Sequence, residues 1–316
     1  MKKIFFMLLV VTLVTQSILA QETTIEDVFK MKMTHSLISR GDNYPNFNSN
    51  LNGVRYLLTA LHKNIPITDF QQKMKFSDDK IDSITDALIK RNYLHKINGV
   101  YKPTLFIADS TDGAMLYKYA KPISKDIVKQ VEKSISSIKR DFSETSMYQK
   151  QGFEHWSFFL LSNVLLDNWQ INSVEEHFLK VKERPLRHGK YYYNSLQQLQ
   201  GKVEPFGIYG NQVGNVSVYG NNRHIVNVAE TDNVILEKDY QILNKIASDF
   251  LPNLLKVLEK NRKYAEQVYK KTGYSNEITF NEFFIWWYHF IYTQSTNMMA
   301  DKNLLKLPKD GNFAYR

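Results

Sequence analysis

The stretch Phe283-Phe-Ile-Trp-Trp-Tyr-His-Phe-Ile-Tyr292 decides the fold, because it is apolar on nearly every side. It lies in a segment, 281–300, that follows a helix-start signal: Thr279 can cap the helix, and Glu282 completes a Thr-x-x-Glu capping box. A helix that is hydrophobic all round is normally buried in the centre of a protein. We therefore expect 281–300 to be the central helix of a large core.

Amphipathic helices are predicted before a polar stretch at 143–152. The first begins near residue 109 and ends near Pro122, because proline cannot continue the hydrogen bonds of a helix. The second covers 124–142, where apolar residues recur with a period of 3.6 residues. The stretch 143–152 lacks this period and is predicted to be a domain boundary or a hinge.

The chain after this boundary is predicted to be mainly helical. One or two buried helices are expected at 153–178, and a long helix is expected at 239–271 with a kink or break at Pro252. Between them, 201–222 is rich in Gly and Asn and indicates short strands joined by turns, which could form a mobile flap. The end of the chain, 307–315, is expected to be extended.

The region before the boundary has the local signals of a small helical unit with a hairpin. Residues 25–40 read as a helix, and apolar residues at helical spacing follow at 51–61 and, after a cap at Ser77, at 81–89. Two β-prone runs then flank Asn98-Gly99. This dipeptide is a strong hairpin signal because both turn residues must accept a positive φ.

Short helices followed by a hairpin resemble the winged helix-turn-helix domain of MarR-like regulators, over about residues 51–108. The resemblance implies that the third helix would read DNA and that the hairpin wing would touch phosphate. That helix carries four carboxylates, on Asp78, Asp79, Asp82 and Asp86. A polyanion would repel them, so the sequence disfavours nucleic acid as the partner.

The first twenty residues are predicted to be a signal peptide. Lys2 and Lys3 precede an almost unbroken apolar run, 4–14, and a small-residue junction follows before Gln21. The run is short for a membrane span, although an uncleaved N-terminal anchor is the alternative. The junction resembles export signals of Bacteroidota. We expect an exported chain, periplasmic or extracellular, with no membrane span after cleavage.

Composition excludes several chemistries. The chain has no cysteine, which removes thiol nucleophiles, Cys-based zinc sites and iron–sulfur clusters. No histidine pair has a recognised metal spacing, and neither a phosphate-loop motif nor a Gly-x-Ser-x-Gly motif is present. The net charge is +9; without Lys2 and Lys3, 39 basic against 32 acidic residues leave +7. We expect no cofactor and no metal.

The densest positive cluster is a candidate anion-binding site, since arginine matches the geometry of carboxylate and phosphate groups. It consists of Lys182, Arg184, Arg187, His188 and Lys190. A solvated loop is the alternative interpretation of the cluster. Candidates for a pocket elsewhere in the C-terminal region are His155, Glu282 and His289.

The predicted fold class is mostly α with minor β, or α+β. The expected domains are the signal peptide at 1–20, a winged-helix-like unit at 21–142 and a larger helical domain at 153–316, which includes the Gly/Asn-rich β segment. Residues 25–40 and 124–142 are candidate surfaces for a homodimer, by analogy with winged-helix proteins that pair through flanking helices.

Three classes of function are open. An exported, soluble protein that binds another protein or a small anionic ligand is favoured, because every strong signal is structural and no catalytic set stands out. The first alternative is a hydrolase with a non-motif active site in the C-terminal domain, which requires His155, the arginines, His188 or His289 to meet in one cleft. The second is a nucleic-acid-binding winged-helix protein.

Overall fold

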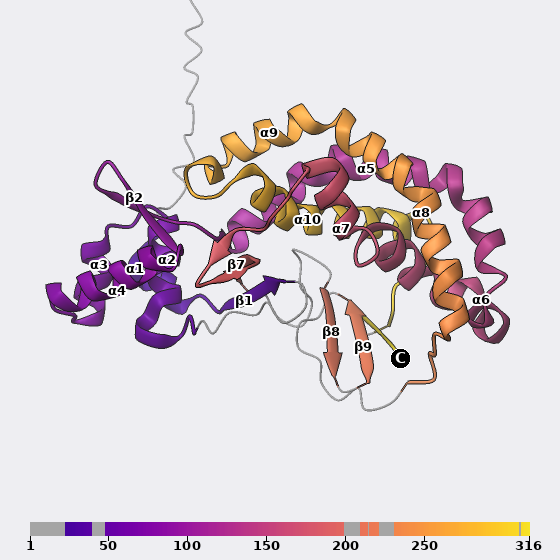
Figure 1. Ribbon diagram of the computed structural model, residues 1–316, viewed down its shortest axis with the longest axis horizontal. Coiled ribbons are helices and arrows are strands. Elements are labelled where there is room, and N and C mark those ends of the chain that lie inside the picture. The colour runs from indigo at the N-terminus through magenta and orange to yellow at the C-terminus, as the bar shows by residue number, and fades with distance from the viewer. Residues whose placement is uncertain (1–22, 40–47, 199–208, 214, 221–230, 310) are drawn as a thin grey trace, which may run out of the picture.

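The computed structural model describes residues 23–39, 48–198, 209–213, 215–220, 231–309 and 311–316 (Figure 1). The predicted signal peptide, 1–20, lies outside these residues. The described chain is mostly helical and carries small sheets, which confirms the predicted fold class. Within this part of the chain, none of the helices combines the length and the apolar character that crossing a bilayer requires.

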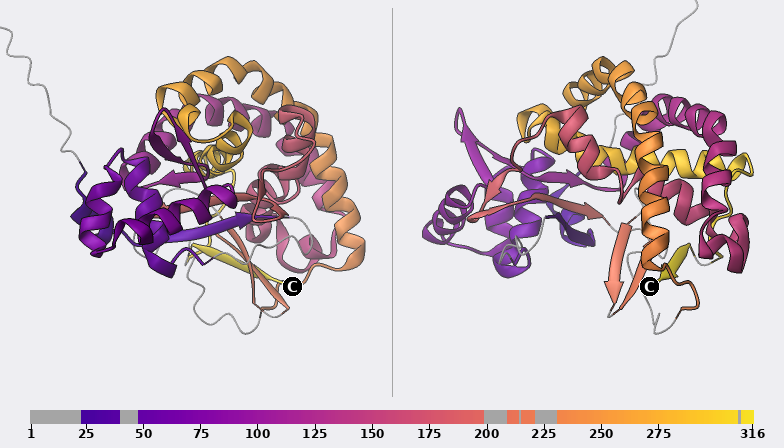
Figure 2. Two further views of the ribbon diagram at one scale, coloured as in Figure 1. Left: turned by 60° about the vertical axis from the view of Figure 1, so that its left-hand side comes forward. Right: turned by 45° about the vertical axis from the view of Figure 1, so that its right-hand side comes forward.

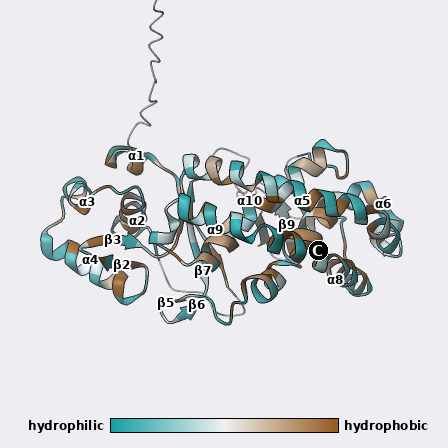
Figure 3. Ribbon diagram, turned by 90° about the horizontal axis from the view of Figure 1, so that it is seen from above, coloured by the Kyte–Doolittle hydropathy of each residue, from teal (hydrophilic) through white to brown (hydrophobic). Residues whose placement is uncertain are grey.

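The aromatic segment forms the central helix, α10, Phe280–Asp301. Every residue from 282 to 296 is buried, as the sequence predicts for a helix that is apolar all round. Helix α5, Ser110–Phe142, packs most extensively along it (Figures 1 and 3). The Trp287 indole donates to Leu116 O at 2.9 Å, so the contact has polar links as well as apolar packing.

Helix α5 is continuous, which corrects the prediction that Pro122 ends one helix and that Ser124 caps another. Pro122 and Lys118, whose carbonyl loses its helical partner, are both exposed, so water can satisfy that carbonyl. Ser124 Oγ donates to Ala120 O at 3.0 Å and to Ile291 O at 2.8 Å. Packing on α10 therefore helps the helix to continue through the proline.

Helix α8, Glu237–Lys260, tolerates a proline in the same way. The sequence places the kink or break at Pro252, but α8 continues through this exposed residue and ends at Asn261. Helix α9, Arg262–Lys271, follows, and Gly273 has a φ of 81° just beyond its end. The other helical segments of the body are α6 Ser146–Phe158, the π-helix η2 Phe159–Val164, α7 Ile171–Ser173, the π-helix η3 Val174–Leu179 and η4 Tyr274–Asn276.

The N-terminal unit, residues 25–103, contains the predicted helices and hairpin. Asn98 and Gly99 have φ values of 50° and 81°, as the predicted turn requires. The resemblance to a winged helix stays a prediction. The elements of this unit after its first strand are η1 Leu51–Gly53, α2 Val54–His62, α3 Ile67–Met74, α4 Asp78–Lys90, β2 Leu94–Ile97 and β3 Val100–Pro103.

The start of the unit departs from the predicted helix at 25–40. Helix α1 covers only Ile25–Lys30, and strand β1, Met33–Ile38, follows. Strand β1 pairs antiparallel with β7, Tyr193–Gln198, which in turn pairs parallel with β4, Phe106–Ala108. A distant strand thus overrides the local helical pattern, because tertiary pairing decides the state of short segments.

The β1-β7-β4 sheet lies between two cores. Ile107 and Leu196 point into the core of the N-terminal unit, whereas Phe106 and Tyr193 point into the core of the helical body, which comprises residues 110–301. The views in Figure 2 show the two parts on opposite sides of this sheet. The polar stretch 143–152 lies within the helical body, since Phe142 and Met147 belong to the same core.

A second sheet closes the helical body near the C-terminus. It has the strand order β10-β9-β8, formed by Asn312–Tyr315, Val216–Gly220 and Tyr209–Val213. The predicted extended tail is therefore a strand in its last part. The predicted strands at 201–222 are described only in part, because residues 201–208, 214, 221 and 222 lie outside the described chain.

Candidate binding cleft

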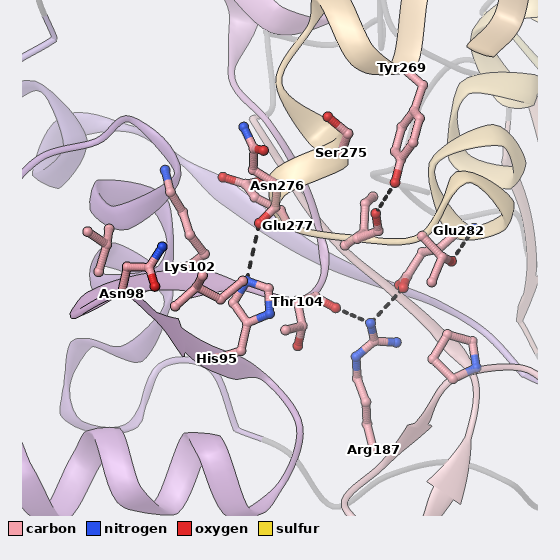
Figure 4. A pocket seen from close by; sticks show the side chains of 15 residues that line it. His95, Asn98, Lys102, Thr104, Arg187, Tyr269, Ser275, Asn276, Glu277 and Glu282 are labelled. Carbon is pink, nitrogen blue, oxygen red and sulfur yellow. Dashed lines mark hydrogen bonds and ion pairs between the residues drawn. The ribbon is translucent and has the colours of Figure 1, made fainter.

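A cleft of about 760 Å³ opens between the β2–β3 hairpin and the start of α10 (Figure 4). The N-terminal unit forms one wall, and the helical body forms the other. The lining residues are His95, Ile97, Asn98, Val100, Lys102, Thr104, Pro185, Arg187, Tyr269, Ser275, Asn276, Glu277, Ile278, Thr279 and Glu282. A neighbouring cavity of about 260 Å³ shares Lys102, Asn276 and Glu277 with the cleft.

The hairpin gives the cleft an apolar edge. Ile97 and Val100 flank the Asn98-Gly99 turn and are 52% and 55% exposed. Both side chains are β-branched and stiff, so they present apolar surface at little cost in conformational entropy. An exposed apolar pair at the mouth of a cleft is a favourable contact for the apolar part of a ligand.

A buried ion pair forms the floor of the cleft. Arg187 Nη2 lies 2.6 Å from Glu282 Oε2, and the two residues are 3% and 1% exposed. Arg187 also donates to the carbonyl oxygens of Tyr192 and Thr104. Burial raises the pKa of Glu282, and the Arg187 guanidinium opposes this shift. The guanidinium thus links helix α10 to the residue that follows the hairpin and to the residue that precedes β7. Figure 4 shows its contacts with Thr104 and Glu282.

The helix cap places Glu282 at this floor. Thr279 Oγ1 accepts from the Glu282 N–H at 3.3 Å, as predicted for the cap of α10. The carboxylate does not return to the cap, as a full capping box would require. It accepts from Arg187 and from the Asn194 N–H instead, because a buried cation is a stronger partner than one exposed amide.

A second charged cluster fixes the other end of the cleft. His62 Nδ1 lies 2.7 Å from Glu277 Oε2, and its Nε2 lies 3.4 Å from Asp112 Oδ2. Burial by itself would lower the pKa of His62, but the two carboxylates together raise it to about 9. Lys63 binds Asp112 and Asp109 at 2.6 and 2.7 Å. These pairs attach α2 to the helical body.

Lys102 and His95 contribute polar groups from the hairpin. Lys102 Nζ donates to the uncharged Asn64 Oδ1 at 2.5 Å, and His95 Nε2 lies 3.2 Å from Asn276 O. Among the described lining residues, neither side chain hydrogen-bonds to a hydroxyl, which is the pairing that activates a serine or threonine nucleophile.

The members of the predicted anion-binding cluster have different surroundings. The Arg184 guanidinium binds Glu175 at 2.8 and 2.9 Å, and Arg187 binds Glu282, so each arginine already has a carboxylate. Lys182 and Lys190 are exposed. His188 has a φ of 50° and, with Gly189, makes the turn between β5, Leu186–Arg187, and β6, Lys190–Tyr191. Arg187 is the member of the cluster that lines the cleft.

The predicted pocket residues occupy different places. Glu282 lies in the cleft with Arg187. His155 is exposed and lines a separate cavity of about 460 Å³, where its Nε2 lies 2.7 Å from Asn233 Oδ1. His289 is buried on α10, with Nδ1 2.8 Å from Ile285 O and its ring against Trp286. These groups do not meet in one cleft, which is what the hydrolase hypothesis required.

Sequence reasoning missed His62, which lines the neighbouring cavity, and Glu277 and Lys102, which line both that cavity and the cleft. They come from α2, from the loop before α10 and from β3, and no spacing in the sequence links them. The Asn98-Gly99 turn is the signal that could have located the apolar edge, because it fixes which side chains stand at the hairpin tip. Comparison with protein-family models, with curated proteins and with solved structures gave no match.

Proposed function

We propose that the protein is an exported binding protein whose ligand site is the cleft between the hairpin and α10. The observation that carries this proposal is a cleft of about 760 Å³ with an apolar edge and a buried ion pair at its floor. Ligand sites for small molecules have about this volume and combine apolar walls with a few fixed polar groups.

The lining favours a small ligand with an apolar body and one anionic group. Ile97 and Val100 would contact the apolar body. Arg187 and protonated His62 are each neutralised by a carboxylate, whereas the Lys102 amine binds an uncharged amide. An anionic group would therefore gain most beside Lys102.

Nucleic acid is a poorer ligand for this surface. Helix α4 is the third α-helix of the winged-helix-like segment 51–108 and corresponds to the helix that would read DNA. Its four aspartates are all exposed, so this face carries negative charge: Asp78, Asp79, Asp82 and Asp86.

Binding of anilinonaphthalene sulfonate, an apolar anion that fluoresces when bound, tests the proposal. We expect saturable binding to the wild type and an affinity at least tenfold lower in the double variant Ile97→Asp/Val100→Asp, because burial of one such side chain is worth about 1.5–3 kcal/mol. The matched control is Leu51→Asp/Leu307→Asp, which changes two exposed leucines, 62% and 42% exposed, outside the cleft. Equal losses in both double variants would refute the assignment.

The charge of the ligand is tested separately with Lys102→Gln. We expect this variant to bind the sulfonate several-fold more weakly and to lose much of the salt dependence of binding. Its affinity for N-phenylnaphthylamine, an uncharged relative of the probe, should stay the same. If both probes weaken equally, Lys102 has a structural role and the ligand needs no anionic group.

A further inference from the structure

A buried carboxyl group outside the cleft lies beside α10 and β9. Asp167 follows the π-helix η2 and is 8% exposed. Its hydrogen-bond partners are the hydroxyls of Tyr219 on β9 and Tyr292 on α10. Among the described groups that act on this carboxyl there is no lysine, arginine or histidine. A buried carboxylate without a cation is costly, so the protonation state of Asp167 needs an explanation.

The direction of the neighbouring hydrogen bonds supplies that explanation. Thr296 Oγ1 donates to Tyr292 O at 2.8 Å, because a carbonyl oxygen only accepts. The single hydroxyl hydrogen of Thr296 is then used, so Ser162 Oγ, at 2.7 Å, donates to Thr296. For the same reason Tyr219 Oη, at 2.8 Å, donates to Ser162. Tyr219 has no hydrogen left for Asp167, so the carboxyl group is the donor in their hydrogen bond.

We propose that Asp167 is a proton-binding site that fastens the β8-β9-β10 sheet to the helical body. With its proton, the carboxyl group starts a continuous chain of donors through Tyr219, Ser162 and Thr296 that ends on a backbone carbonyl. When the carboxyl group loses its proton, three hydroxyl hydrogens remain for four hydrogen bonds, so one of these hydrogen bonds must break. Ionisation therefore weakens the attachment of β9.

The environment of the carboxyl group agrees with this assignment. Burial raises the pKa of Asp167 to about 7, and the hydrogen bond with Tyr292 only partly opposes the shift. The titratable groups that face it are Tyr219 from β9, Tyr288 and Tyr292 from α10, and Tyr315 from β10. The rings of His289 and Tyr292 are in contact, with centroids 5.2 Å apart. Tyr240 of α8 contributes to the raised pKa of Tyr315.

The outer strand β10 has further links to the body: Asn233 Nδ2 donates to Ala314 O at 2.8 Å, and Phe313 packs on Trp156 with ring centroids 5.1 Å apart. Tyrosines of β9 and β10 make further contacts. Tyr219 packs on Phe158 with ring centroids 5.3 Å apart, and Tyr315 packs on Phe159 at 4.7 Å. Asn163 Nδ2 donates to the Tyr315 hydroxyl at 3.4 Å, a long hydrogen bond. The hydroxyl network is thus the main polar connection that the described residues make between β9 and the π-helix. Its loss would be felt first at β9 and then, through strand pairing, at β10.

Amide hydrogen exchange of the full chain tests the proposal. After correction for intrinsic exchange, we expect the opening constant of amides in 216–220 and 312–315 to rise by up to about tenfold per pH unit between about pH 4 and 7 and then to level off. The opening constant rises with pH because the pKa of Asp167 is raised in the closed state. As the pH increases, Asp167 therefore loses its proton in the open state first. Asp167→Asn should remove the dependence, and Asp301→Asn, at an exposed position on α10, should keep it.

A second pair of variants tests the donor-to-acceptor direction of the hydrogen bonds between the hydroxyl groups. Thr296→Val removes the acceptor for Ser162, which can then donate to Tyr219 and free the Tyr219 hydrogen for the carboxylate. We expect this variant to lower the titration midpoint of Asp167, followed by its carboxyl infrared band, although residue 296 does not touch the carboxyl group. Thr296→Ser keeps the hydroxyl and should leave the midpoint unchanged.

Two results would overturn the proposal. One is the absence, at pH 5, of a protonated carboxyl band that disappears in Asp167→Asn. The other is the same titration midpoint in Thr296→Val and Thr296→Ser. If the variant fails to fold, the absence of any protonated carboxyl band in the folded wild type at pH 5 would overturn the proposal by itself.

Discussion

Single charged residues in the interior of this protein are matched by partners from distant parts of the sequence. Arg187 reaches Glu282, and His62 reaches Glu277 and Asp112. The cost of burying each charge is offset only while its partner is present. Substitutions of one partner should therefore be far more damaging than substitutions of surface pairs.

Glu282→Gln should lower the free energy of unfolding by about 3 kcal/mol, because it leaves the Arg187 guanidinium buried without a counter-charge. Urea denaturation at pH 7 measures the change. Glu259→Gln is the matched control, since Glu259 is 62% exposed and pairs with Arg262 at 2.8 Å on the surface. The control should change stability by less than about 1 kcal/mol. Similar effects at both sites would show that Glu282 does not bear the buried charge.

His62 should make stability fall in mildly alkaline solution. Its pKa is about 9 in the folded state against 6.5 for the free side chain, so the unfolded chain loses this proton first as the pH rises. The contribution is complete below pH 6.5 and is lost as the pH rises through 9, for a total of roughly 3 kcal/mol. Urea denaturation from pH 6 to 10 measures it. His62→Gln should be less stable at pH 6 and should show a flatter profile, whereas parallel profiles would contradict the assignment.

At the scale of the element, the hairpin depends on its turn. Gly99 has a φ of 81°, a conformation that costs a residue with a side chain about 1–2 kcal/mol. Gly99→Val should therefore lower stability by about that amount and weaken binding of the sulfonate probe in the cleft. Asn98→Gly keeps a residue suited to positive φ and should leave probe binding unchanged. If Gly99→Val binds the probe as the wild type does, the hairpin does not shape the site.

Elements with local causes could be predicted from the sequence, and elements with distant causes could not. The hairpin at Asn98-Gly99 and the cap at Thr279 follow from residues that are adjacent in the chain. The strand at 33–38 was missed because its partner lies at 193–198. The effect of Pro122 was overestimated because exposure of the residue and packing on α10 are tertiary facts.

Residues of the candidate site could be predicted only where a local sequence pattern pointed to them. Arg187 and Glu282 were singled out separately, from a basic cluster and from a helix start, and nothing in the sequence indicated that they form an ion pair. His62 lies in an ordinary amphipathic helix, and its charge comes from carboxylates that are distant in sequence. Predicting it would have required the packing of α2 on α5.

At the scale of the whole molecule, the export hypothesis makes a direct prediction. When the full-length gene is expressed in a bacterium with a periplasm, the purified protein should begin at Gln21, because signal peptidase cuts after small residues that follow the apolar run. N-terminal sequencing and the intact mass measure this. Leu8→Arg/Leu9→Arg interrupts the apolar run and should leave the unprocessed chain inside the cell. Unprocessed wild-type protein in the cytosol would remove the main argument against a gene regulator.

The structure shows which elements form the two segments proposed as homodimer surfaces. Of the two segments proposed for it, 25–40 contributes α1 and the sheet strand β1, and 124–142 is the second part of α5. Strand β1 pairs with β7 on one side, and α5 packs on α10 with one face. Within the described chain, a second copy could contact only the other side of each element.

The β1-β7-β4 sheet also determines when the chain can fold during its synthesis. Its middle strand, β7, is made long after its two neighbours, β1 and β4. A nascent chain that has reached only residue 142 holds both outer strands and lacks the one that joins them. The ribosome must pass residue 198 before the N-terminal unit can gain this support. Until then β1 and β4 have no strand that joins them. Under the export hypothesis, this delay would help the chain to reach a secretion channel before the sheet forms.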